Sequence, residues 1–172
     1  MSIVAKRYSF ERLPEAVQAR WTAHSQALLD SYRARVGKEL IARSRKPQDE
    51  AERLFAAPFV VVSHGAEVDP ILNYGNAAAL ALWEMSPEEL IATPSRLTAE
   101  AEVREAREHV LAETARKGFV TGYRGVRVSR TGRRFRIQDV TVWNVTDADA
   151  RLLGQTATFA HWEWLDGEAR PL

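Results

Sequence analysis

The chain has 172 residues, of which 45% are hydrophobic, enough to bury the core of one domain with a peripheral extension. Its formal net charge of +1 gives no long-range attraction to nucleic acid or to an anionic membrane, so neither is expected as a partner. The absence of cysteine excludes disulfides, thiolate metal sites and a cysteine nucleophile. The sequence shows no apolar leader and no apolar run of membrane-spanning length, and we expect a cytoplasmic protein.

The first predicted element is a helical arm from Pro14 to about Ala42, within an N-terminal helical extension of residues 1–48. Its apolar side chains recur at helical spacing and form one stripe. Such an arm either packs on the open sheet of the following domain or pairs with its copy in a dimer. The stripe consists of Val17, Trp21, His24, Leu28 and Tyr32.

A β-hairpin is predicted next, after one or two helical turns over residues 49–56. The β-branched run from Phe59 to about His64 is too short for a separate helix. A short polar loop returns the chain to a second strand over Ile71–Tyr74, which makes the pair antiparallel.

Two helix starts follow this hairpin directly. Asn76 is a good N-cap, because its side-chain oxygen can accept a hydrogen bond from the first turn. Ser86 and Glu89 form a capping box, and Pro87 suits the first helical position. A third helix is expected from about Thr98 to Lys117.

Three strands complete the predicted domain, over Phe119–Ser129, Arg133–Val145 and Leu152–Trp162. Helices inserted between two hairpin-like β runs indicate an α+β domain, an antiparallel sheet with helices packed on one face. The long middle strand alternates, and one set of its side chains is expected to share an inward face. That set is Phe135, Ile137, Asp139, Thr141, Trp143 and Val145.

The spacing Tyr74-x-Asn76-x-Ala78-x-x-x-Leu82-Trp83-x-x-Ser86-Pro87-Glu88-Glu89-Leu90 resembles the commonest signature of PAS sensory domains. The resemblance is closer still to the MEKHLA family, a PAS-like domain. It is carried by FAAPFVVVSHG, ILNYGNAAALALWE, SPEELIATPSRLTAE, GYRGVRVSRTGRRFRIQDVTVWNV and GQTATFAHW. It implies a PAS-like five-stranded antiparallel sheet over residues 49–165, with a tail of residues 166–172. It also implies a sensory or regulatory role, with no settled ligand or reaction.

In a PAS-type fold the helices pack over the concave face of the sheet and can enclose a pocket for a small ligand. For the aromatic candidates and Met85, ordinary core packing is the alternative to ligand contact. The candidate ligand-binding side chains are His64, Trp83, Met85, Arg96, Tyr123, Phe135, Asp139 and Trp143.

Asp139 interrupts the apolar face of the long strand, where an unpaired carboxylate is costly. It accepts structural hydrogen bonds from Arg96, His64 or a loop N–H, or it contacts a polar ligand, or a one-residue slip in register turns it to the other face. His64 either pairs with Asp139, binds a ligand or titrates as a switch. Arg96 either reaches an anionic ligand or makes a salt bridge.

The sequence leaves the cofactor unknown. His109 lies on the helix from which haem-binding PAS domains supply their axial ligand, but its position is the only support. A flavin photoreceptor is disfavoured, because no cysteine can form the adduct.

We therefore expect a sensory or regulatory module that binds a small ligand and self-associates as a homodimer. One alternative is a protein–protein interaction module without a ligand. Another, less favoured, is a small cone-fold isomerase or hydrolase-like enzyme with His64 and Asp139 as its general base. Strand order, and whether these two side chains meet at a cavity, would separate the enzyme from the sensor.

The sequence raises nucleic-acid binding as a further class of function, because arginines cluster near one hairpin. Aromatic side chains are not interleaved on the arginine face, so solvated arginines on paired strands are the preferred interpretation. The cluster consists of Arg124, Arg127, Arg130, Arg133, Arg134 and Arg136.

Overall fold

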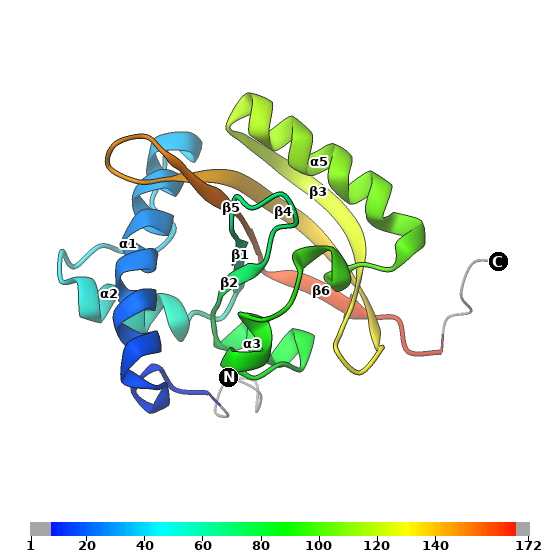
Figure 1. The fold of residues 1–172 in the computed structure, drawn as a ribbon, viewed down its shortest axis with the longest axis horizontal. Coiled ribbons are helices and arrows are strands. Elements are labelled where there is room, and N and C mark those ends of the chain that lie inside the picture. Colours follow the sequence, from blue (N-terminus) through cyan, green and yellow to red (C-terminus); the bar gives the residue numbers. More distant parts are fainter. Residues whose placement is uncertain (1–7, 168–172) are drawn as a thin grey trace.

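The computed structural model describes residues 8–167, apart from the side chain of Glu102. Over this range the chain folds around one antiparallel sheet in the order β2-β1-β5-β4-β3, with β6 paired to β4 (Figure 1). The α+β fold class expected from the sequence is confirmed. The strands are β1 (Val60–His64), β2 (Leu72–Gly75), β3 (Phe119–Val128), β4 (Arg134–Thr146), β5 (Leu152–Phe159) and β6 (His161–Trp164).

Helices cover both faces of this sheet, α5 one face and α1 the other (Figure 1). Residues 1–7 of the expected N-terminal extension and residues 168–172 of the expected C-terminal tail lie outside the described part of the chain. The α-helices are α1 (Glu15–Val36), α2 (Pro47–Phe55), α3 (Ala77–Trp83), α4 (Pro87–Leu90) and α5 (Arg104–Lys117). Short 3₁₀ turns are η2 (Phe10–Arg12), η3 (Ser95–Thr98) and η4 (Ala101–Val103).

Both predicted helix starts are present. The Asn76 side chain accepts a hydrogen bond from Ala79 N at 3.1 Å, and Ser86 and Glu89 form the complete capping box. Asn76 also accepts from Val61 N at 3.0 Å and donates to Phe59 O at 2.7 Å. One buried side chain therefore starts α3 and fixes it against β1.

The helical arm packs on the sheet, which is one of the two placements expected for it. Trp21 Nε1 donates to Asn73 O at 2.9 Å, so α1 is fixed to β2. Trp143 Nε1 of β4 donates to Ser31 Oγ at 3.0 Å. Helix α1 ends at Val36, earlier than the sequence indicated, because the next residue is a glycine in the left-handed conformation.

A buried carboxylate joins α1 and α2. Glu50 is fully buried, and its oxygens lie 3.0 Å from Arg43 Nε and 3.0 Å from Gln26 Nε2. The backbone N–H of Arg45 donates to the same carboxylate at 2.8 Å. The hydrogen-bonded Arg43 guanidinium is the main reason why the pKa of Glu50 falls to about 2. This network fixes the arm to the segment that enters the sheet.

Asp139 divides β4 into two halves. Its φ of 51° places it in the left-handed region, and β4 pairs with β6 before it and with β5 after it. This β-bulge shifts the alternation of side chains by one residue. The expectation of a single inward face is therefore wrong. Phe135 packs against Trp83 of α3, whereas Trp143 faces α1. Asp139 itself is exposed.

Candidate functional site

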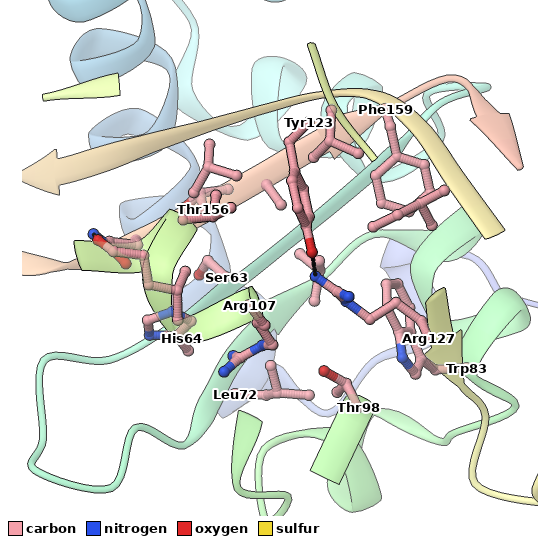
Figure 2. Close-up of a pocket in the computed structure, with 18 residues that line it drawn as sticks. Ser63, His64, Leu72, Trp83, Thr98, Arg107, Tyr123, Arg127, Thr156 and Phe159 are labelled. Atoms are coloured by element: carbon pink, nitrogen blue, oxygen red, sulfur yellow. Dashed lines mark hydrogen bonds between the residues drawn. The ribbon is translucent and has the colours of Figure 1, made fainter. Parts of the chain in front are cut away.

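A cavity of about 60 Å³ lies between the sheet and the helices α3 and α5 (Figure 2). Its floor is the face of β1, β5, β4 and β3 that is turned away from α1, and η3 closes one side. The apolar part of the floor consists of Val62, Ile137, Val140, Val142, Ala157 and Phe159. The side chains that cover it come from β2, α3 and α5 and include Leu72, Trp83, Val110 and Leu111.

Two buried arginines from different elements line this cavity. Arg107 of α5 and Arg127 of β3 are each only 8% exposed. Arg107 Nη2 donates to Ser95 Oγ at 2.9 Å, and Arg127 Nη2 donates to Tyr123 Oη at 3.3 Å. Within the described residues, neither guanidinium forms an ion pair with a carboxylate. Two positive charges are therefore buried at one cavity on neutral partners.

The two like charges of this pair repel each other. Burial, followed by the positive charge of Arg127, lowers the pKa of Arg107 to about 10. Replacing water around a guanidinium by apolar side chains is costly unless an anion or several acceptors replace it. The arrangement thus favours a negatively charged group in the cavity.

Gly125 allows Tyr123 and Arg127 to meet across the strand surface. The three residues alternate along β3, and the Arg127 guanidinium lies 5.5 Å from the centre of the Tyr123 ring. A Cβ at Gly125 would lie 2.5 Å from Tyr123 Oη and 3.0 Å from Arg127 Nη1. The missing side chain therefore keeps room for the tyrosine–arginine contact.

His64 contributes a hydrogen-bond acceptor to the same cavity. Its Nδ1 lies 2.9 Å from Gly65 O, which can only accept, so Nδ1 carries the proton. Nε2 then holds a lone pair, and it is buried without a hydrogen-bond partner among the described residues. Burial, followed by the nearby charge of Arg107, lowers the pKa of His64 and keeps the ring neutral.

The end of β1 beside His64 is packed tightly against β5. Gly154 has a φ of 147°, and a Cβ there would lie 1.8 Å from His64 O. No side chain fits between these two backbones, so the strands approach more closely than other residues would allow.

Comparison with known families identifies the chain. The MEKHLA domain family matches residues 22–164, a range that contains about two thirds of α1 and every strand from β1 to β6. The chain belongs to the MEKHLA domain family. A search of curated proteins found no match.

Solved structures show that this MEKHLA domain has a PAS-like fold. A PAS domain from Colwellia psychrerythraea is 14% identical with a TM-score of 0.56, over 64% of this chain and 92% of that one. A light-oxygen-voltage domain studied with a flavin analogue is 14% identical with a TM-score of 0.51, over 66% and 81%. The blue-light activated histidine kinase EL346 of Erythrobacter litoralis is 15% identical with a TM-score of 0.52, over 67% and 35%.

Three of the expected ligand-binding residues line the cavity of the MEKHLA domain, namely His64, Trp83 and Tyr123 (Figure 2). They come from β1, α3 and β3, which the fold brings together around one space. Trp83 Nε1, like His64 Nε2, is buried without a hydrogen-bond partner in the described part of the chain. Trp83 Nε1 is thus an unused donor and His64 Nε2 an unused acceptor among the described residues.

The other apolar candidates lie outside the cavity lining. Phe135 packs edge-on against Trp83, with ring centres 5.2 Å apart. Met85 is buried, and its carbonyl accepts from Tyr8 Oη at 3.2 Å. Trp143 lies on the opposite face of the sheet, where its ring centre is 4.9 Å from that of Tyr32.

The polar candidates Arg96 and Asp139 also lie outside the lining. Arg96 Nε contacts an Asp69 carboxylate oxygen at 3.1 Å in an exposed ion pair, one of the two alternatives expected for it. Asp139 sits at a surface hollow beside His161 and Trp162. Among the described residues, His64 and Asp139 form no hydrogen bond or ion pair, because the bulge turns Asp139 outward.

Most arginines of the cluster form ion pairs, all of them exposed except that of Arg134, which is largely buried. Arg133 pairs with Asp166 at 2.6 Å, Arg134 with Glu100 at 3.3 Å and Arg136 with Glu163 at 3.3 Å. Arg130 lies 3.5 Å from Glu89. Only Arg127 of this cluster lines the cavity, and Arg124 is exposed.

Sequence reasoning missed Arg107 and Arg127 as site residues. Arg107 stands within an otherwise apolar helical stripe together with Val103 and Val110. Arg127 shares the alternating face of β3 with Tyr123 and a glycine. A charged side chain on a buried face was a visible signal in both cases.

The structure also bears on the questions of haem, metal ions and membrane-spanning helices. His109, the position considered for haem, is exposed on α5 and does not line the cavity. Within residues 8–167, no group of three or more histidine, cysteine or carboxylate side chains is arranged to hold a metal ion. No helix in that range is long and apolar enough to cross a membrane.

Proposed function

We propose that this MEKHLA domain is a sensory module that holds a small ligand between α5 and the sheet. The observation that carries the proposal is a cavity where two buried arginines, Arg107 and Arg127, meet neutral partners alone among the described residues and where His64 Nε2 is orphaned. Buried polar groups normally find partners, and an orphaned group in a cavity indicates one supplied from outside. The PAS-like fold supports a sensory role.

The size of the cavity limits the ligand. Pockets for drug-sized molecules span roughly 300–1,000 Å³. A cavity of about 60 Å³ instead suits a molecule of a few heavy atoms. It has no room for a flavin ring system, so the flavin of the light-oxygen-voltage neighbour is not carried over to this chain.

A ligand in this position can change the domain mechanically. It would contact Arg107 on α5 and Arg127 on β3, and so hold the helix against the outer strand of the sheet. A molecule that binds the closed arrangement better than the open one shifts the population toward it. Slower amide hydrogen exchange in α5 on ligand binding is the expected signature.

Native mass spectrometry of the chain purified from its own host tests retention of a ligand. We expect a small adduct that is lost on denaturation. Ala157→Leu, which places extra volume in the cavity floor, should lose the adduct. Ala112→Leu, on the exposed side of α5, is the matched control and should keep it. An adduct that survives in Ala157→Leu would place the ligand elsewhere.

The same proposal includes self-association, supported by a small exposed apolar surface. Val68, Ile71 and Leu97 are exposed, and their segments meet where Ser95 N donates to Pro70 O at 2.8 Å. Light scattering after gel filtration should give a dimer, and Leu97→Glu should give a monomer. Leu152→Glu, at an exposed site on β5, is the control that stays dimeric. A monomeric wild type would contradict this part.

A further inference from the structure

We infer that the ligand of this cavity is a small carboxylate, bound at its charged end by Arg107 and Arg127. The inference rests on the proposed function, because it names the class of molecule that the same cavity holds. It extends that function from an unspecified ligand to one recognised through its negative charge.

The first step is the supply of unused donors. A guanidinium offers five N–H groups and cannot lose its charge under ordinary conditions. Arg107 uses one of them on Ser95 Oγ, and Arg127 uses two groups, on Val126 O and Tyr123 Oη. All of these partners are neutral. The remaining donors belong to two side chains that line the cavity, so an acceptor there can satisfy both.

The second step is the placement of the two charges. Arg107 comes from α5 above the sheet and Arg127 from β3 in its floor, and Figure 2 shows their side chains extending toward the same space. Because α5 and β3 each bring a positive charge to one cavity, the two guanidinium groups repel each other when no anion is bound. An anion between them would replace that repulsion by two attractions.

The third step separates a carboxylate from other anions. The cavity combines the guanidinium groups with a floor of Val62, Ile137, Val142 and Ala157. A small carboxylate has the same division, with two oxygens at one end and carbon at the other. Guanidinium groups match the planar carboxylate with paired hydrogen bonds. Phosphate presents oxygens on every side and would place some of them on the apolar floor.

The test is calorimetric titration of the full chain with sodium acetate and sodium propionate in chloride buffer of constant ionic strength. Acetamide and propionamide serve as uncharged probes of the same shape, and inorganic phosphate as a different anion. We expect saturable binding of at least one carboxylate, at least tenfold weaker binding of its amide, and weaker binding of phosphate.

Variants of the two arginines test whether the carboxylate binds to them. Arg107→Gln and Arg127→Gln should each weaken carboxylate binding at least tenfold, while circular dichroism confirms that they fold. Two separate variants are used so that misfolding of one leaves the other decisive. Arg124→Gln, exposed on the same strand as Arg127, is the matched control and should bind as the wild type does.

The outcomes distinguish this inference from the proposed function. Equal binding of carboxylate and amide, preferred binding of phosphate, or unchanged binding in both glutamine variants would overturn the carboxylate inference. Retention of a neutral host compound that Ala157→Leu abolishes would do the same, yet it would support the proposed function. Binding of none of these probes, with no adduct in native mass spectrometry, would defeat both.

Discussion

On the face of the sheet covered by α1 and α2, the buried carboxylate of Glu50 meets Arg43, Gln26 and a backbone N–H. On the face covered by α5, the buried guanidinium groups of Arg107 and Arg127 meet neutral groups alone among the described residues. The first face balances its charge internally. The second retains charge that a ligand can balance. Under the function proposed above, the first face serves stability and the second serves recognition.

The largest expected effect breaks the balanced face. Glu50→Ala leaves Arg43 without its principal partner and removes three contacts of the carboxylate. Removing one member of a buried ion pair costs about 3–5 kcal/mol. Urea unfolding should show that loss, whereas Glu52→Ala, in a surface contact on the same helix, should change stability by less than about 0.5 kcal/mol. Equal losses for the two variants would contradict the structural role of Glu50.

The next effect is a dependence of folding stability on pH, which arises on the same face. Burial lowers the pKa of His24 from 6.5 to about 4, and its Nε2 lies 2.9 Å from Ser63 Oγ. The folded state therefore binds fewer protons than the unfolded chain between these values. Stability is full above pH 6.5 and should fall by roughly 2–3 kcal/mol as the pH drops to about 4.

Denaturant midpoints measured across this pH range check the effect. His24→Gln removes the titrating ring and should flatten the profile, although the lowered pKa of His64 leaves a smaller slope of the same sign. His161→Gln, at an exposed position, should reproduce the wild-type profile. A flat wild-type profile between pH 6.5 and 4 would show that His24 is not held neutral.

A smaller change in stability, of opposite sign, is expected on the face covered by α5. Arg107→Met replaces a buried, unpaired charge by an apolar side chain of similar length, and such replacements are often neutral or stabilising. We expect the ligand-free protein to gain about 1 kcal/mol in urea unfolding, at the expense of carboxylate binding. A loss comparable to that of Glu50→Ala would mean that Arg107 is structural, and the contrast between the two faces would disappear.

The smallest expected change in stability is at Gly125. Its added Cβ in Gly125→Ala would meet the mobile end of Tyr123, which can rotate away, so stability should fall by less than about 1 kcal/mol. The contact between Tyr123 and Arg127 should be lost, and carboxylate affinity should fall several-fold in calorimetric titration. Thr121→Ala, exposed on the same strand, is the control.

Local signals accounted for much of the fold. Asn76, Ser86 and Glu89 start their helices through contacts with nearby backbone groups, so sequence spacing was sufficient to predict them. The bulge at Asp139 was not predictable in this way, because it depends on where β4 changes partner from β6 to β5. One extra residue exchanges the two faces of a strand. Trp143 was therefore placed on the wrong side.

The candidate site was only partly predictable for the same reason. His64, Trp83 and Tyr123 were chosen from their positions in strands and helices, and they do line the cavity. Arg107 and Arg127 are distant in sequence, and their juxtaposition depends on how α5 lies over β3. Net charge and local pattern carry no information about such a pairing. Their possible role became visible only from the burial of both groups without a carboxylate.

The close approach of β5 to His64 has a consequence for variation within the family. Because a Cβ at Gly154 would lie 1.8 Å from His64 O, MEKHLA sequences that keep this strand geometry should keep glycine at that position. Gly125 should vary together with Tyr123 and Arg127, since its space exists for their contact. A relative with a larger residue there and no arginine at the position of Arg127 would mark a branch whose cavity responds to a different chemical signal.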